Sequence, residues 1–105
     1  MTIQNGAVKD KAGEPVDLKL AKPPAAGEWR LYVRPSRVVM GEAAANAENR
    51  IAADVAFAEF LGDFYRYHFK SGALELFCDY SGPERFNPGQ RCLVGWDSAH
   101  MSVFQ

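Results

Sequence analysis

Gly and Pro punctuate most of this 105-residue sequence at short intervals. Among them are Gly13, Pro15, Pro23, Pro24, Gly27, Pro35, Gly41, Gly62, Gly72, Gly82, Pro83, Pro88 and Gly89. Gly adopts backbone conformations that other residues avoid, and Pro interrupts helices and sheet ladders. Turns this close together favour short strands over long helices. The spacing therefore predicts a mostly β chain.

Between the turns, apolar and polar side chains often alternate, which is the period of a strand with one buried face. This pattern predicts strands at residues 15–20, 29–34, 64–69, 74–78, 91–97 and 101–104. A hairpin is expected where Lys70-Ser71-Gly72 joins two of them. In the first strand of that hairpin, Tyr65, Tyr67 and Phe69 share one side.

The segment 42–61 fits two interpretations. It is rich in Ala, and the i, i+4, i+7 spacing of Ile51, Val55 and Ala58 suits an amphipathic helix, which local propensity favours. As a strand, it places Ile51, Ala53, Val55 and Phe57 on one face. The apolar phase then changes, which requires a bulge or bend near residues 58–59. Residue patterns alone leave both interpretations open.

Composition indicates one globular domain. The chain is 48% hydrophobic and carries a formal charge of −1, so neither disorder nor nucleic-acid binding is expected from charge alone. Its apolar runs are far shorter than a membrane span, and no signal-peptide pattern is present, which predicts a cytosolic chain. Cys78 and Cys92 fit no disulfide framework and are expected to be reduced and buried.

The order of several short motifs is informative. They are Leu31-Tyr32-Val33-Arg34-Pro35, Asn49-Arg50-Ile51, Glu59-Phe60-Leu61-Gly62-Asp63, Arg66-Tyr67, Asn87-Pro88-Gly89 and Val94-Gly95-Trp96-Asp97. Their sequence resembles the TOBE type 2 domain, the transport-associated OB-like domain at the C-terminus of ATP-binding subunits of bacterial ABC importers. The closest likeness is to the branch for polyamines, iron and sugars. It covers residues 29–105 well and residues 1–28 more loosely.

This resemblance implies an all-β fold: an OB-like small barrel of about five strands with an additional N-terminal strand pair. A single domain would span 1–105, with N-terminal strands in 1–40, a linker at 41–48 and the barrel core in 49–105. Residues 49–61 would then form a long bent strand. Ser36 follows Pro35 where the family usually has an acidic residue, so no role for a carboxylate is carried over to that position.

The resemblance also implies a non-catalytic accessory or regulatory domain that supports dimerisation of the ATPase subunits or regulates solute import. Its partners would be a second copy, the ABC ATPase domain and the membrane permease subunits, at the inner face of the cytoplasmic membrane. ATP and Mg²⁺ would bind only the parent ATPase domain, and this chain would hold no cofactor. The expected interface or effector residues are Arg34, Pro35, Phe60, Leu61, Gly62, Arg66 and Tyr67.

Catalytic motifs do not fit the sequence. A phosphate-binding loop ending in Lys70-Ser71 would need Gly at positions 64 and 69, where this sequence has Phe. An ABC signature motif ending in Gly89-Gln90-Arg91 would need Ser-Gly before it, where this sequence has Asn87-Pro88. The residues that could ligate a metal do not have the spacing of a zinc site, and they do not form a recognisable nucleophilic triad. They are His68, Cys78, Cys92 and His100. The sequence therefore predicts a chain that is not an enzyme and holds no metal.

Three alternative functions remain open from the sequence. One is a stand-alone oxyanion-binding module like other TOBE domains. Another is a single-stranded nucleic-acid binder that stacks bases on Tyr65, Tyr67 and Phe69, beside Arg66 and Lys70. A third is a purely structural dimerisation domain.

Overall fold

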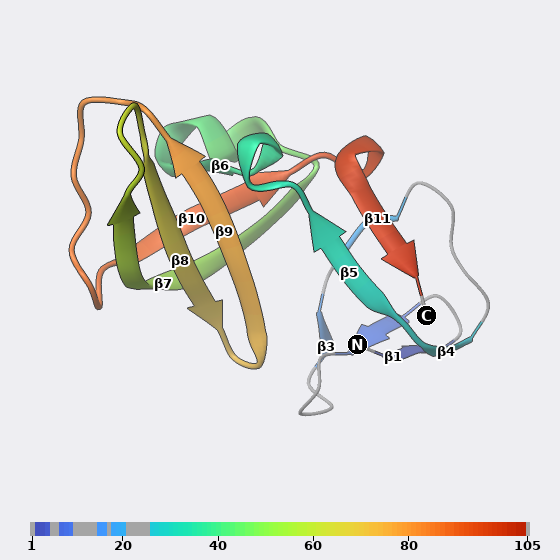
Figure 1. Cartoon of the computed structure of the whole chain (residues 1–105). Coiled ribbons are helices and arrows are strands. Elements are labelled where there is room, and N and C mark those ends of the chain that lie inside the picture. The colour runs from blue at the N-terminus through green and yellow to red at the C-terminus, as the bar shows by residue number, and fades with distance from the viewer. Residues whose placement is uncertain (1, 5–6, 10–14, 17, 21–25, 105) are drawn as a thin grey trace.

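The fold is centred on a curled five-stranded antiparallel sheet, shown at the left of Figure 1. The computed structural model describes residues 2–4, 7–9, 15–16, 18–20 and 26–104. Strand order in this sheet is β6-β10-β7-β8-β9. The strands are β6 (Val39–Met40), β7 (Asn49–Phe60), β8 (Tyr65–Ser71), β9 (Leu74–Tyr80) and β10 (Arg91–Trp96). This half-barrel confirms the predicted all-β, OB-like fold.

Two smaller sheets and three short 3₁₀ helices complete the described structure. A two-stranded sheet pairs β5 (Arg30–Val33) with β11 (Met101–Phe104). A four-stranded sheet, in the order β3-β2-β1-β4, contains β1 (Thr2–Gln4), β2 (Ala7–Lys9), β3 (Pro15–Val16) and β4 (Gly27–Glu28). The 3₁₀ helices are η1 (Pro35–Arg37), η2 (Gly41–Asn46) and η3 (Ser98–His100).

The N-terminal prediction needs correction in detail. Four short strands occur where one strand pair was expected. The strand predicted at 15–20 is limited to Pro15–Val16, while residues 18–20 have no regular structure and Asp17 lies outside the described residues. Leu18 instead packs against the main core, and Lys19 binds the start of β7 through its backbone. Tertiary contacts, rather than a local ladder, therefore hold residues 18–20.

The ambiguous segment is a strand from Asn49 to Phe60, with a short 3₁₀ helix before it in the expected linker at 41–48, and its bulge lies earlier than expected. Residues 41–46 form η2, and the twelve-residue β7 follows. Ala53 and Val55 face the core, but the pairing with β8 shifts between Val55 and Phe57. A bulge inserts one residue and reverses the facing of every later side chain. Phe57 is consequently half-exposed rather than part of the inner face.

The predicted hairpin is confirmed, with a tighter turn. Ser71 and Leu74 are the last paired residues of β8 and β9, so the loop is Gly72-Ala73 rather than Lys70-Ser71-Gly72. Gly72 has φ +59°, a conformation that suits Gly at a two-residue hairpin turn. The turn sets which residues of β8 and β9 lie opposite each other, and this register determines where the candidate site residues of β8 lie.

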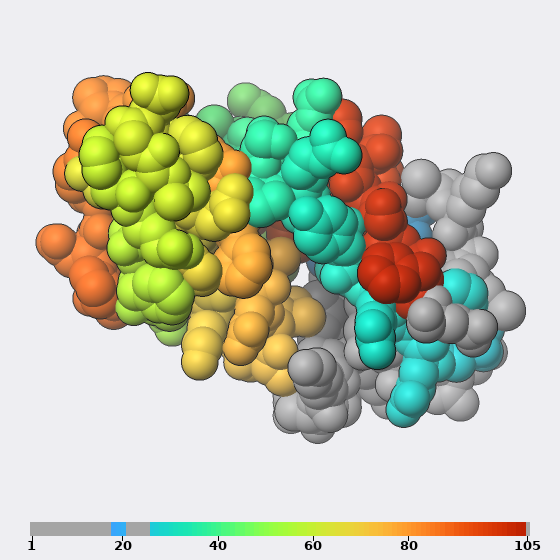
Figure 2. Space-filling model, viewed as in Figure 1, coloured from blue at the N-terminus to red at the C-terminus, as the bar shows by residue number. Residues whose placement is uncertain are grey.

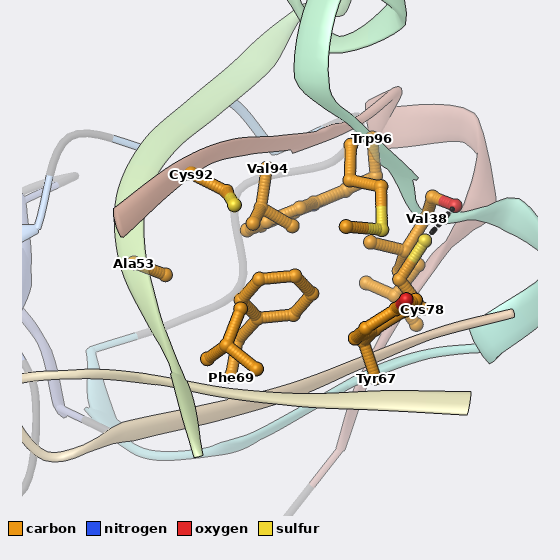
Figure 3. Close-up of a cluster of buried hydrophobic side chains, with 11 residues drawn as sticks. Val38, Ala53, Tyr67, Phe69, Cys78, Cys92, Val94 and Trp96 are labelled. Atoms are coloured by element: carbon orange, nitrogen blue, oxygen red, sulfur yellow. Dashed lines mark hydrogen bonds between the residues drawn. The ribbon is translucent and has the colours of Figure 1, made fainter. Parts of the chain in front are cut away.

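The core lies between β8 and β10, as Figure 3 shows. Tyr67 and Phe69 project from β8, and Val94 and Trp96 from β10; each is at most 1% exposed. The two cysteines are free and buried, as predicted. Cys78 donates a hydrogen bond to the Val38 carbonyl at 3.0 Å, and burial raises the pKa of its thiol to about 12. These thiols therefore act as packing groups.

At Gly95, β10 lies very close to its neighbours. A Cβ placed there would lie 2.7 Å from the Ala47 Cβ and 2.8 Å from the Asn49 carbonyl oxygen. Gly95→Ala is expected to lower the free energy of unfolding by about 1–3 kcal/mol because the backbone must shift. Urea denaturation measures the change, and Ala47→Gly in the same chain should restore part of it. An unchanged urea midpoint would contradict this prediction.

Candidate functional site

The seven predicted interface or effector residues fall into two places. Arg34 and Pro35 lie where β5 meets η1. The other five lie at the β7–β8 connection and in β8: they are Phe60, Leu61, Gly62, Arg66 and Tyr67. The two places are connected through β9, because η1 packs on β9 and β9 pairs with β8.

The tip of the β7–β8 hairpin presents two exposed apolar side chains. Phe60 is 65% exposed and Leu61 44% exposed. The backbone beneath them is ordered, since the Leu61 N–H donates to the Phe64 carbonyl at 2.9 Å and Gly62 turns the chain at φ +97°. We call Phe60 and Leu61 the hairpin tip. This rigid apolar projection is suited to contact with another protein surface.

Tyr67 and Pro35 are buried and support the surface from beneath. The Tyr67 hydroxyl accepts a hydrogen bond from the Phe86 N–H at 3.3 Å. Its ring meets Tyr80 and Phe86 edge-on, at centroid distances of 6.1 and 5.5 Å. Pro35 is buried at the start of η1. Both residues position exposed neighbours rather than offering contact area of their own.

The aromatic row that suggested base stacking faces inward. Tyr67 and Phe69 are each 1% exposed. Tyr65 is half-buried at the open end of the sheet, where the Arg85 guanidinium lies 4.5 Å from its ring centroid and Phe60 lies against it. Stacking requires open ring faces, so this row is not available as a platform for bases.

A different aromatic row, which the sequence did not reveal, lies on the outer face of the sheet. The Phe57 and His68 rings are stacked with centroids 3.9 Å apart, and His68 lies 4.4 Å from Phe77. His68 also shares a hydrogen bond with the Glu59 carboxylate. We call Phe57, His68 and Phe77 the outer row. The outer row depends on which residues lie opposite each other in neighbouring strands after the bulge, and the sequence alone does not give that register.

Arg66 is held in place beside the outer row. Its guanidinium makes a two-bond contact with Asp79, at 2.8 Å from Nε and 3.2 Å from Nη2. This hydrogen-bonded ion pair raises the pKa of Arg66, with smaller contributions from Glu59 and Tyr32. A bidentate pair fixes the orientation of both side chains. Arg66 therefore forms a defined polar border to the outer row.

Arg34 is exposed at the end of β5, and its guanidinium is not engaged by an acid in the described part of the chain. Within residues 18–20 and 26–104, no group of three His, Cys, Asp or Glu side chains is arranged to hold a metal ion. The four metal-ligand candidates are thus not brought together there. The geometry offers contact surfaces and charged groups, which is chemistry suited to binding.

Comparison with known proteins identifies the fold family. Residues 31–104 match the TOBE domain family, type 2, and no curated protein matches the chain. TOBE domains are transport-associated OB domains typical of the C-terminal region of ABC transporter ATPase subunits, and the domain is a non-catalytic module. Among the described residues, no helix has the length and apolar character needed to cross a bilayer. The match covers most of the sequence and the whole five-stranded sheet, so this chain belongs to the TOBE domain family.

Proposed function

We propose that this chain is the accessory domain of an ABC importer's ATP-binding subunit, and that it associates with a second copy of itself to hold two subunits together during transport. It acts by binding, and the parent ATPase domain supplies ATP and Mg²⁺ binding. Its place is the cytoplasmic face of the membrane, beside the ATPase domain and the permease subunits. Family membership supports the transport context.

The observation that carries self-association is the hairpin tip. Two large apolar side chains project from an ordered turn, with exposed fractions of 65% and 44%. The outer row lies on the opposite face of the sheet from Phe60, which packs against Tyr65. Its two phenylalanines, Phe57 and Phe77, are 50% and 39% exposed, and the paired charges of Arg66 and Asp79 border that row. A two-fold interface needs such a self-complementary patch, with an apolar centre and a polar rim.

Sedimentation equilibrium of the purified chain at micromolar concentrations tests this proposal. We expect a reversible dimer, and the double variant Phe60→Ser/Leu61→Ser should dissociate at least about tenfold more readily because it removes the central apolar contacts. Leu93→Ser is the matched control, since Leu93 is also an exposed apolar side chain, on β10. A wild-type chain that stays monomeric, or equal weakening in the control, would contradict self-association.

The transport context has a separate test. An immunoblot of the source cells, with an antibody against this 11.6 kDa domain, measures the mass of the native product. A band several-fold heavier supports attachment to an ATPase domain. A band near the mass of the domain would count against that context while leaving the self-association result intact.

A further inference from the structure

A second surface, away from the hairpin tip, is a slot between β5 and β9. Figure 2 shows the molecule hollowed between these two strands, which are teal and orange there. The hollow has a volume of about 550 Å³, and residues 29–33 and 73–77 line it. Because each run is consecutive, the backbone edges of both strands bound this space together with their alternate side chains. We call it the edge slot.

β9 presents unpaired backbone groups to the edge slot. It is an edge strand of the five-stranded sheet, with β8 as its neighbour. The two-residue turn makes Ser71 and Leu74 a hydrogen-bonded pair, and such pairs recur at every second residue of an antiparallel ladder. Leu76 therefore directs its N–H and C=O to β8, whereas Glu75 and Phe77 direct theirs away from it. No hydrogen bond within the described part of the chain engages those outward groups.

β5 presents the opposite edge of the slot. Its partner among the described strands is β11, in a separate two-stranded sheet. In an antiparallel ladder with one partner, every second residue directs its N–H and C=O to the unpaired side. The arrows of β5 and β9 point the same way in Figure 1, and η1, which follows β5, packs on β9. The edge slot thus separates two open strand edges that run in the same direction.

The side chains around the edge slot form an apolar floor and a mixed rim. Leu31 and Leu76 pack against the core and make the floor. Tyr32 and Phe77 are half-exposed at the rim. A strand with apolar side chains on one face and polar side chains on the other matches this division, because successive side chains of a strand point to opposite faces.

The rim also carries two opposite charges. Arg30 on β5 and Glu75 on β9 are both exposed, and none of the ion pairs in the described part of the chain includes either residue. A neutral polar side chain lying between them, such as Gln, can accept from the guanidinium and donate to the carboxylate. Charge complementarity at the rim therefore favours a neutral polar residue in the ligand.

The number of open edges limits what can fill the edge slot. A strand that pairs with both β5 and β9 must have both of its own edges free. Every described strand of this chain already has a neighbour in its sheet, so a strand from a second copy could pair with only one edge. The geometry therefore calls for a single extended segment that is not part of a sheet.

We propose that the edge slot binds an extended peptide segment of a partner protein by strand addition. The segment runs antiparallel to β5 and β9, so its backbone bonds to both edges. Its apolar side chains contact Leu31 and Leu76, and a neutral polar side chain lies between Arg30 and Glu75. Unpaired edges are templates for such pairing. This inference does not depend on the proposed transport function, and it uses a surface other than the hairpin tip.

An NMR titration of the ¹⁵N-labelled chain tests the site with a synthetic peptide, acetyl-Ser-Val-Thr-Val-Gln-Val-Ser-amide. We expect saturable shifts of backbone amides in residues 30–33 and 74–77. The control peptide has the same side chains but carries N-methyl groups on Thr and Gln, which removes two backbone donors, so it should bind at least about tenfold more weakly. Equal binding of the two peptides, or no shifts up to millimolar peptide, would overturn the proposal.

Two variants at one position separate backbone pairing from side-chain contact. Glu75→Pro removes the N–H that faces the edge slot, and Pro is tolerated on an edge strand where its nitrogen faces away from the neighbour. It should weaken peptide binding about tenfold. Glu75→Ala is the matched control, because it keeps the N–H, and should weaken binding less than about threefold. Unchanged amide shifts outside residues 73–78 verify folding, and equal weakening by the two variants would count against strand addition.

Discussion

Tyr67→Ala should destabilise the chain strongly, lowering the free energy of unfolding by about 3–5 kcal/mol. The Tyr67 ring is 1% exposed and contacts Tyr80 and Phe86, and its hydroxyl accepts the Phe86 N–H. Truncation would leave a cavity beneath the loop that follows β9 and an unpaired N–H. The total free energy of unfolding of a domain of this size is about 5–15 kcal/mol, so the urea midpoint should fall steeply.

Two companion variants show whether the ring or the hydroxyl is responsible. Tyr67→Phe keeps the packing and loses one hydrogen bond, so we expect a loss of about 1 kcal/mol. Phe57→Ala truncates a ring that is 50% exposed and should cost clearly less than Tyr67→Ala. If Tyr67→Ala keeps its stability but loses self-association, Tyr67 would be an interface residue rather than a support.

The elements predicted correctly are those whose pattern is local. Apolar and polar residues alternate through β8 and β10, and a two-residue turn with Gly joins β8 to β9. Each of these signals lies within a few positions of sequence. Burial of Cys78 and Cys92 followed from the same alternation.

Segment 42–61 illustrates what local signals lack. Its Ala content suits a helix, and helix propensity differs from strand propensity by only small amounts per residue. In the fold, β10 and β8 pair with opposite edges of β7 and satisfy its backbone hydrogen bonds. Long-range pairing therefore outweighs propensity. The position of the bulge depends on the same pairing, and so does the outward facing of Phe57.

The convergence of Arg34, Arg37, His100 and Ser102 around one pocket was only partly predictable for a similar reason. Arg34 belongs to a recognisable motif, and Arg37 follows it at the spacing of one 3₁₀ turn. His100 and Ser102 are far away in sequence, and without the pairing of β5 and β11 His100 is simply an exposed side chain near the end of the chain. Register, rather than residue type, brings these groups together.

Asn49 shows how one buried polar side chain joins the N-terminal part to the sheet. It is 1% exposed at the start of β7. Its Oδ1 accepts the Lys19 N–H, and its Nδ2 donates to the Lys19 carbonyl at 3.0 Å. A single amide thus satisfies both backbone groups of a residue that belongs to no strand. A side chain with one donor and one acceptor is required to do this.

Asn49→Asp should therefore destabilise the chain severely, by about 3 kcal/mol or more at neutral pH, because it buries a charge and removes the donor to the Lys19 carbonyl. Burial raises the pKa of the introduced carboxyl in the folded state above its unfolded value. As pH rises, the carboxyl therefore loses its proton in the unfolded state before it does so in the folded state. The free energy of unfolding falls through this pH range, and the loss is complete above the pKa of the folded state. Urea midpoints should show the deficit shrinking as pH falls from 7 towards 4, where the protonated acid can donate again.

Asn49→Leu separates the charge from the lost hydrogen bonds. It leaves both Lys19 backbone groups unpaired without adding an ionisable group, so its deficit should be about 2–4 kcal/mol and independent of pH. The pH-dependent excess in Asn49→Asp then measures the cost of the buried charge. A pH-independent deficit in Asn49→Asp would mean that water reaches this site. The Asn49 contact with residues 18–20 would then be an open surface contact, and the N-terminal part would not share the stability of the sheet.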